Sequence, residues 1–166
     1  MAASTPDPAP VDLLVLDVDG VLTDGRIVLD GSGRETKQFH VRDGFAMRRW
    51  QQRGGALAII TGRSSDAVAA RAAELDIEHV FQGVSDKAAV IEEIMRELGR
   101  DASRAAAMGD DWPDVPMLER VGYPMTVADA PEEIRAKCAF VTQRCGGDAA
   151  VREAIEHLLR GRGEWP

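Results

Sequence analysis

The sequence predicts an α/β fold: a three-layer, open, mostly parallel sheet with a small β-hairpin flap and no large cap domain. Short apolar runs alternate along the chain with amphipathic stretches, as they do where helices join parallel strands. The run at 11–16 is almost wholly apolar, which is typical of a central strand covered on both faces. A length of 166 residues, 45% of them hydrophobic and 29% charged, suits one globular domain with its own core.

The chain divides into a short tail and one domain. Residues 1–10 include three prolines and are predicted to form a flexible N-terminal tail, and residues 11–166 the single domain. Residues from about 26 to 41 are predicted to form the hairpin flap, because two short apolar runs flank the turn-rich cluster Asp30-Gly31-Ser32-Gly33. The apolar runs predict sheet strands at 11–16, 56–60, 79–82, 105–108, 124–127 and 139–142.

Helices are predicted between these strands from apolar side chains at helical spacing and from polar capping residues. The predicted helices span 44–52, a segment that runs up to 75, 87–98, about 113–121, a short segment from 131, and 149–160. The caps expected for the first three are Asp43, Ser64 or Ser65, and Ser85. Right-handed crossovers between such strands build an open sheet, and ligands bind beyond the carboxyl ends of its strands.

Charge and composition exclude several classes of protein. The chain carries 20 Lys and Arg against 28 Asp and Glu, a net charge of −8, so nucleic acid is not expected as a partner. No apolar run approaches the roughly 20 residues that span a bilayer, and membrane insertion is not expected. The first residues lack the basic and apolar regions of a secretory signal, and Cys138 and Cys145 suit reduced thiols. We therefore expect a cytoplasmic protein.

Polar clusters stand directly after three of the predicted strands: Asp17 with Asp19, Thr61 with Arg63, and Asp110 with Asp111 and Asp114. Because the carboxyl ends of parallel strands meet at one edge of a sheet, these clusters are expected to lie together. Crowded carboxylates repel one another and persist where a cation neutralises them, and their oxygens suit Mg²⁺. Each cluster alone is explained as well by a turn or a cap, and Lys87 alone by a solvated helix start. Their joint occurrence favours a site.

Four segments resemble the signature motifs of the haloacid dehalogenase superfamily of phosphohydrolases: Asp17-Val18-Asp19-Gly20-Val21, Thr61-Gly62-Arg63, Lys87, and Gly109-Asp110-Asp111-Trp112-Pro113-Asp114. The chain resembles more narrowly the 3-deoxy-D-manno-octulosonate 8-phosphate phosphatases in the segments 39–44, 59–64 and 146–153. The resemblance covers residues 11–159. The sequence departs from the family pattern at Ala149, where the family has glycine, and at His40, where it often has asparagine.

The resemblance implies a fold of the haloacid dehalogenase type and phosphate-ester hydrolysis through an aspartyl-phosphate. A phosphate monoester reacts very slowly, so positioning and charge neutralisation must supply most of the acceleration. Asp17 is expected to be the nucleophile, and Asp19, two residues on, the general acid and then the general base. Thr61 and the amide of Gly62 are expected to contact a phosphate oxygen, and Lys87 to neutralise the phosphoryl group.

The resemblance also implies a Mg²⁺ cofactor. Asp17, Asp110 and the backbone carbonyl of Asp19 are the expected ligands. Asp111 and Asp114 are expected to lie outside the ligand set, where they orient waters or the catalytic lysine.

The expected substrate is a sugar-acid phosphate, most specifically 3-deoxy-D-manno-octulosonate 8-phosphate, a precursor in lipopolysaccharide synthesis. An arginine can bind its carboxylate through two parallel hydrogen bonds. The family pattern places substrate contacts at Asp19, His40, Val41, Arg42, Asp43, Gly44, Arg48, Gly62, Arg63, Arg71 and Lys87. For each arginine alone, a surface role explains the residue nearly as well.

The resemblance implies a homotetramer in which hairpins pack together and a neighbour covers the site, so that sites lie near subunit interfaces. The apolar hairpin residues Ile27, Val28, Leu29 and Phe39 agree with this, although a flap folded onto its own domain also explains them. The segment Gly146-Gly147 is expected either to reach a site, its own or a neighbour's, or to form a plain turn before a helix.

Three other functions stay open at this point. A receiver-like signalling domain also uses an acidic Mg²⁺ cluster, a threonine and a lysine, but it carries its phospho-accepting aspartate later in the chain. A degenerate, non-catalytic lobe that regulates a sugar-nucleotide synthase would not need every motif residue. The third alternative is the same chemistry on the phosphate of a nine-carbon sugar acid.

Overall fold

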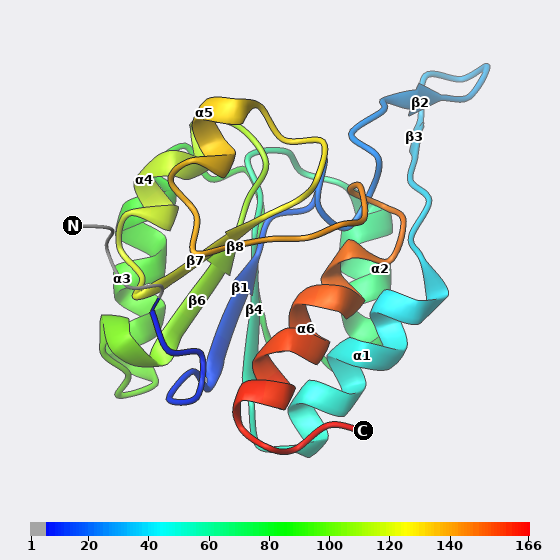
Figure 1. Ribbon diagram of the computed structural model, residues 1–166. Coiled ribbons are helices and arrows are strands. Elements are labelled where there is room, and N and C mark those ends of the chain that lie inside the picture. The colour runs from blue at the N-terminus through cyan, green and yellow to red at the C-terminus, as the bar shows by residue number, and fades with distance from the viewer. Residues whose placement is uncertain (1–5) are drawn as a thin grey trace.

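The computed structural model describes residues 6–166 and confirms the predicted α/β class. Six strands form one parallel sheet in the order β5-β4-β1-β6-β7-β8. Their bounds are β1 Leu13–Leu16, β4 Ala56–Ile60, β5 His79–Phe81, β6 Ala105–Met108, β7 Tyr123–Thr126 and β8 Phe140–Val141. Figure 1 shows α1, α2 and α6 on one face of the sheet and α3, α4 and α5 on the other, so the fold has three layers. Residues 1–5 of the predicted tail lie outside the described residues.

The hairpin flap is present but very short. β2 (Val28–Leu29) pairs antiparallel with β3 (Glu35–Thr36), and the carboxylate of Asp30 accepts hydrogen bonds from the backbone N–H groups of Ser32 and Arg34 across the turn. The hairpin projects well away from the three layers (Figure 1). No large cap domain is seen in the described part of the chain, as expected.

The helices are α1 Val41–Gln52, α2 Asp66–Glu74, α3 Lys87–Glu97, α4 Val115–Leu118, α5 Glu132–Arg135 and α6 Ala150–Gly161. The expected cap of α1 is wrong. The helix begins three residues earlier than predicted, because the Nδ1 atom of His40 accepts the backbone N–H of Arg42, and Asp43 lies inside the first turn. The expected cap of α3 is also wrong by one residue, since Asp86 and not Ser85 accepts the N–H of Ala89.

The helix expected at 113–121 is split. A single 3-10 turn, Trp112–Asp114, precedes the one-turn helix α4, which ends at Leu118. The side chain of Asp114 accepts backbone N–H groups of Asp110 and Asp111. These side-chain bonds hold the segment in a tight turn where a regular helix would otherwise have started.

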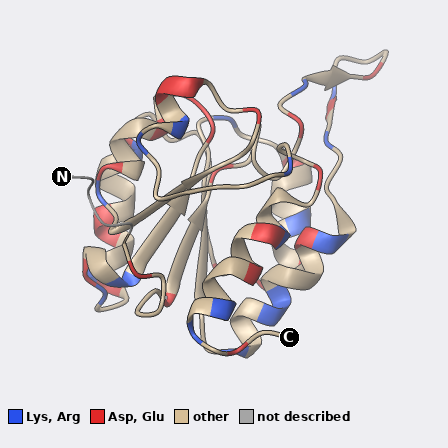
Figure 2. Cartoon of the chain, in the orientation of Figure 1, with Lys and Arg blue, Asp and Glu red and all other residues tan. Residues whose placement is uncertain are grey.

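The three central strands of the sheet, β4, β1 and β6, consist of apolar residues. The strands of the sheet contain no Lys, Arg, Asp or Glu, whereas both signs of charge spread over the helices and loops (Figure 2). All four residues of β1 are fully buried, as are all four of β6. Because β1 lies between β4 and β6 and helices cover both faces, burial of these strands forms the centre of the core. No helix in the described part of the chain is long and apolar enough to cross a membrane.

Strand register brings the predicted clusters to one edge. Leu16, at the end of β1, pairs with Ile59 of β4 on one side and with Met108 of β6 on the other. The backbone N–H of Asp17 then bonds the carbonyl of Met108 at 3.0 Å. The residues that follow the three strands therefore leave the sheet side by side, as expected from its parallel order.

Candidate active site

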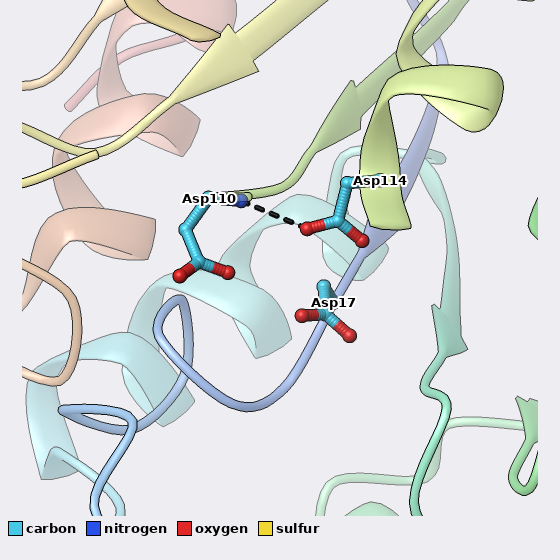
Figure 3. A group of neighbouring side chains, drawn as sticks. All are labelled: Asp17, Asp110 and Asp114. Atoms are coloured by element: carbon cyan, nitrogen blue, oxygen red, sulfur yellow. Dashed lines mark hydrogen bonds between the residues drawn. The ribbon is translucent and has the colours of Figure 1, made fainter. Parts of the chain in front are cut away.

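Three carboxylates converge past the ends of β1 and β6. One oxygen each from Asp17, Asp110 and Asp114 lies within 4.8 Å of the other two. Figure 3 shows the three side chains lying close together, Asp17 from the end of β1 and the other two from the loop and turn after β6. The sequence predicted this gathering, and parallel register is its physical cause.

Lys87 ties two of these carboxylates together. It is the first residue of α3, and its Nζ atom lies 2.8 Å from Oδ1 of Asp17 and 2.5 Å from Oδ1 of Asp114. The lysine side chain is 6% exposed, so its charge needs these partners. The other oxygen of Asp114 accepts the N–H of Asp110 at 2.9 Å. Asp114 therefore sets the loop that carries Asp110 and holds Lys87 at the same time.

Negative charge is in excess at this point. Burial, reinforced by repulsion from Asp114, raises the pKa of Asp17 to about 6, although Lys87 opposes the shift. Burial, with repulsion from Asp114 and Asp17, raises the pKa of Asp110 to about 7. Burial alone would lower the pKa of Lys87, but the carboxylates of Asp17 and Asp114 outweigh it and raise that pKa.

This donor set fits a divalent metal ion. Lys87 contacts two of the three carboxylates, and the oxygens of all three are close enough to surround a single cation. Magnesium is bound through one or two carboxylates with the remaining positions left to water and phosphate oxygens. Bound cations of this kind remove the repulsion that raises carboxylate pKa values.

The absence of a side chain at Gly20 leaves room for the Asp110 carboxylate. The φ angle of Gly20 is +90°, and a Cβ atom there would lie 2.1 Å from Oδ2 of Asp110 and 2.4 Å from its Cγ. Only glycine adopts this backbone conformation without strain and leaves the carboxylate its room.

A cavity of about 340 Å³ opens beside these groups. It brings together nine predicted site residues: Asp17, Asp19, Thr61, Gly62, Arg63, Lys87, Asp110, Asp111 and Asp114. Thr61, at the end of β4, is buried, and Gly62 and Arg63 are exposed. The cavity therefore joins acidic groups to a hydroxyl, an exposed glycine and a guanidinium, which is a set of groups that can surround a phosphate ester.

The other predicted substrate residues do not line this cavity in the single chain. Arg48 pairs with Asp76 at 3.1 Å, and Arg71 pairs with Glu74 at 2.7 Å. A Cβ atom at Gly44 would lie 2.3 Å from a terminal nitrogen of Arg71.

His40 caps α1, and Val41 beside it is 76% exposed. Arg42 borders a separate open hollow on α1 and α6. The substrate role of these residues, and of Arg48, Arg71 and Gly44, stays a prediction.

Asp43 has a structural contact of its own. Its carboxylate is buried and accepts the backbone N–H of Arg152, in the first turn of α6, at 2.7 Å. Burial raises its pKa to about 6, against the effect of that hydrogen bond. The residue thereby joins α1 to the start of α6.

The segment Gly146-Gly147 packs against its own chain. The N–H of Gly147 bonds the carbonyl of Val21 at 3.1 Å, and a Cβ atom at Gly146 would lie 1.9 Å from the carbonyl oxygen of Gly20. This segment thus supports the loop that carries Gly20. Ala149 adopts the left-handed conformation, φ 63° and ψ 28°, which explains why a glycine suits that position in the family pattern.

Two residues of the hairpin join the site without having been predicted. Nζ of Lys37 lies 2.5 Å from Oδ1 of Asp19 and also contacts Glu35. The other carboxylate oxygen of Glu35 bonds a terminal nitrogen of Arg63 at 2.6 Å. Glu35 and Lys37 are two residues apart, which places both on one face of an extended strand, but this spacing does not reveal what that face meets.

The sheet order and the acidic site together define the class of protein, a haloacid dehalogenase-like hydrolase. The family model of that description matches residues 77–155. The 3-deoxy-D-manno-octulosonate 8-phosphate phosphatase KdsC of Escherichia coli (strain K12) is 40% identical over 154 residues, which cover 93% of this chain and 82% of that protein. The chain belongs to the family of 3-deoxy-D-manno-octulosonate 8-phosphate phosphatases, as its motifs indicated.

Solved structures agree with this family. A 3-deoxy-D-manno-octulosonate 8-phosphate phosphatase from Moraxella catarrhalis, in complex with magnesium, phosphate and a KDO molecule, matches with a TM-score of 0.93 at 39% identity, over 96% of this chain and 91% of that one. The enzyme of the same name from Yersinia pestis matches with a TM-score of 0.93 at 38% identity, over 95% and 85% of the two chains. The predicted fold class is thereby confirmed.

Proposed function

We propose that this chain is a Mg²⁺-dependent phosphatase that converts 3-deoxy-D-manno-octulosonate 8-phosphate to 3-deoxy-D-manno-octulosonate and phosphate, for lipopolysaccharide precursor synthesis. The observation that carries the proposal is the placement of Asp17. It stands at the end of the central strand, 2.8 Å from a buried lysine and beside two further carboxylates, at the wall of an open cavity. The membership in the phosphatase family supports the choice of substrate.

The first half-reaction belongs to Asp17 and Asp19. A carboxylate oxygen of Asp17 attacks phosphorus while the bond to the sugar oxygen breaks, which forms an aspartyl-phosphate. Asp19 transfers a proton to the departing oxygen. Lys87, which already holds Asp17, offsets the negative charge of the phosphoryl group.

The second half-reaction reverses the proton transfer. Asp19, now ionised, takes a proton from a water molecule whose oxygen attacks phosphorus, and the bond to Asp17 breaks to release phosphate. Thr61 and the amide of Gly62 contact phosphate oxygens in both steps. All of these residues line the cavity.

Asp17, Asp110 and the backbone carbonyl of Asp19 would hold the Mg²⁺ ion. When bound, the ion supplies positive charge to the phosphoryl oxygens and offsets the repulsion between the carboxylates. Asp114 stays outside the ligand set in this proposal, because Lys87 and the N–H of Asp110 already engage its two oxygens. Asp111 orients waters beside it.

Arg63 is our choice for the substrate carboxylate within the single chain, since it is the arginine that lines the cavity. Arg42, Arg48 and Arg71 stay candidates for contacts in an assembled site. We propose a homotetramer in which hairpins pack together near the sites. The exposed apolar side chains of the hairpin support this: Ile27 is 58%, Val28 46% and Leu29 60% exposed.

The test of the reaction is phosphate release with and without Mg²⁺ from three classes of substrate: 3-deoxy-D-manno-octulosonate 8-phosphate, phosphates of nine-carbon sugar acids, and neutral sugar phosphates. We expect the highest kcat/KM for the first. A preference for the phosphate of a nine-carbon sugar acid would refute the substrate assignment but leave the proposed reaction chemistry in place. A single phosphorylation without turnover would instead indicate a receiver-like domain.

The test of the assembly is mass by light scattering. We expect a mass close to four times 18.0 kDa, and a monomer would count against sites shared between subunits. The cytoplasmic location stays a prediction.

A further inference from the structure

The two aspartates at the end of β1 are held by two different buried lysines. Asp17 is bound by Lys87 of α3, and Asp19 by Lys37 of the hairpin stem. The two lysine side chains are 6% and 2% exposed. The position of each carboxylate is therefore set by a different element, α3 for Asp17 and the hairpin stem for Asp19.

We propose that Lys37 is a positioning residue for Asp19, and that the hairpin through it sets the acid–base step of its own chain's site. The proposal rests on the proposed function, in which Asp19 protonates the leaving oxygen. Nζ of Lys37 lies 2.5 Å from Oδ1 of Asp19. Lys37 directly follows β3, so the hairpin strand fixes its backbone.

Glu35 and Arg63 close a ring of charges around this contact. Glu35 binds Lys37 with one oxygen, and its other oxygen lies 2.6 Å from a terminal nitrogen of Arg63. Nε of Arg63 lies 3.9 Å from Oδ2 of Asp19. Both oxygens of Asp19 thus face a cationic side chain, which fixes the orientation of the carboxyl group.

The ring restrains rotation of the Asp19 side chain. If the Asp19 carboxyl group rotated away from Lys37, the buried ammonium group would keep Glu35 alone of its two acidic partners. Losing a partner in low-polarity surroundings costs free energy, so the rotation is unfavourable. For the same reason, rotation of the Asp17 side chain away from Lys87 is unfavourable. Each of the two aspartates is therefore held in place by its own lysine, and catalysis by two groups requires such fixed positions.

The experiment uses leaving groups, because a general acid matters most when the departing oxygen is strongly basic. The assay is kcat/KM, which reports the steps up to departure of the leaving group, for p-nitrophenyl phosphate and for phenyl phosphate at saturating Mg²⁺. The variants are Lys37→Met and Lys37→Arg. Arg34→Met is the matched control on the same hairpin, since the Arg34 side chain is 84% exposed and pairs with Asp30 of the same turn.

We expect Lys37→Met to lower kcat/KM for phenyl phosphate about 100-fold and for p-nitrophenyl phosphate less than about threefold. Lys37→Arg should restore the ratio of the two esters toward the wild-type value, and Arg34→Met should leave it unchanged. Equal losses on both esters, or no loss on either, would overturn the proposal. If Lys37→Met does not fold, as judged by circular dichroism, Lys37→Gln takes its place with the same expected ratio and the same contrary outcome.

The proposed function is tested separately in the same series. Wild-type protein that hydrolyses aryl phosphates but not 3-deoxy-D-manno-octulosonate 8-phosphate would refute the substrate assignment. The aryl esters would still measure what Lys37 does to Asp19.

Discussion

The contact between Gly20 and Asp110 makes the proposed metal site sensitive to a single methyl group. In Gly20→Ala the new Cβ would lie 2.1 Å from Oδ2 of Asp110, whereas ordinary contacts of this kind begin near 3.4 Å. The carboxylate must therefore move by more than about 1 Å, and metal ligands tolerate only about 0.2 Å. The expected result is an increase of at least about tenfold in the Mg²⁺ concentration that gives half-maximal activity.

The substitution also strains the backbone, and this effect must be separated from the displaced ligand. Gly20 has φ +90°, and a left-handed alanine costs about 1–2 kcal/mol. Gly25→Ala is the matched control: it lies in the same loop with φ +77°, and the nearest atom to its Cβ is a backbone nitrogen at 3.5 Å. Both variants should lose a similar amount of stability.

The assay is phosphate release as a function of Mg²⁺ concentration, with urea unfolding of each variant measured in EDTA. Only Gly20→Ala should need more Mg²⁺. If both variants show the same Mg²⁺ dependence as the wild type, Asp110 is not placed by Gly20 or is not a ligand, and the reasoning fails.

Three further predictions concern single carboxylates. Asp17→Asn should reduce phosphate release to background while circular dichroism shows the fold intact; retained turnover would mean another nucleophile. Asp110→Asn should unfold at a higher temperature than wild type in EDTA at pH 8, because one repelling charge is gone, and should gain less from added Mg²⁺; the reverse order would disprove the crowding argument. Asp43 has its pKa raised from 3.8 to about 6, so the folded state binds its proton more tightly than the unfolded state. Ionised Asp43 therefore costs about 3 kcal/mol above pH 6, and this cost disappears below about pH 3.8. In urea unfolding, the free energy of unfolding of Asp43→Asn minus that of the wild type should increase by about 1 kcal/mol between pH 5 and pH 7. A difference that stays constant with pH would contradict the raised pKa of Asp43.

The strands and the acidic cluster could be predicted because local patterns specify them. β4 and β6 lie where their apolar runs predicted, at Ala56–Ile60 and Ala105–Met108. Strands buried on both faces must be apolar along their whole length. Polar residues that follow them mark the strand ends, and parallel order then places Asp17, Thr61 and Asp110 at one edge.

Helix starts were harder to predict, since several polar residues compete for each cap. Asp43 is a good capping residue by type, but His40 caps α1 because the backbone reaches the extended conformation there, three residues earlier. Asp43 instead faces the start of α6, more than 100 residues away along the chain, where it accepts the N–H of Arg152. Nothing near Asp43 in the sequence indicates that partner.

The amino-acid sequence alone therefore determined the fold class and the acidic groups at the sheet edge. Hydrophobic burial and parallel register are specified by short segments whose pattern is visible in the sequence. The sequence did not determine the partners of long side chains. That Lys37 and Glu35 reach Asp19 and Arg63, while Arg48 turns to Asp76, became known only from the folded chain. Such contacts depend on how the hairpin and distant loops are placed in the folded chain, and the energies that distinguish alternative ion pairs are small compared with the energy of burying the core.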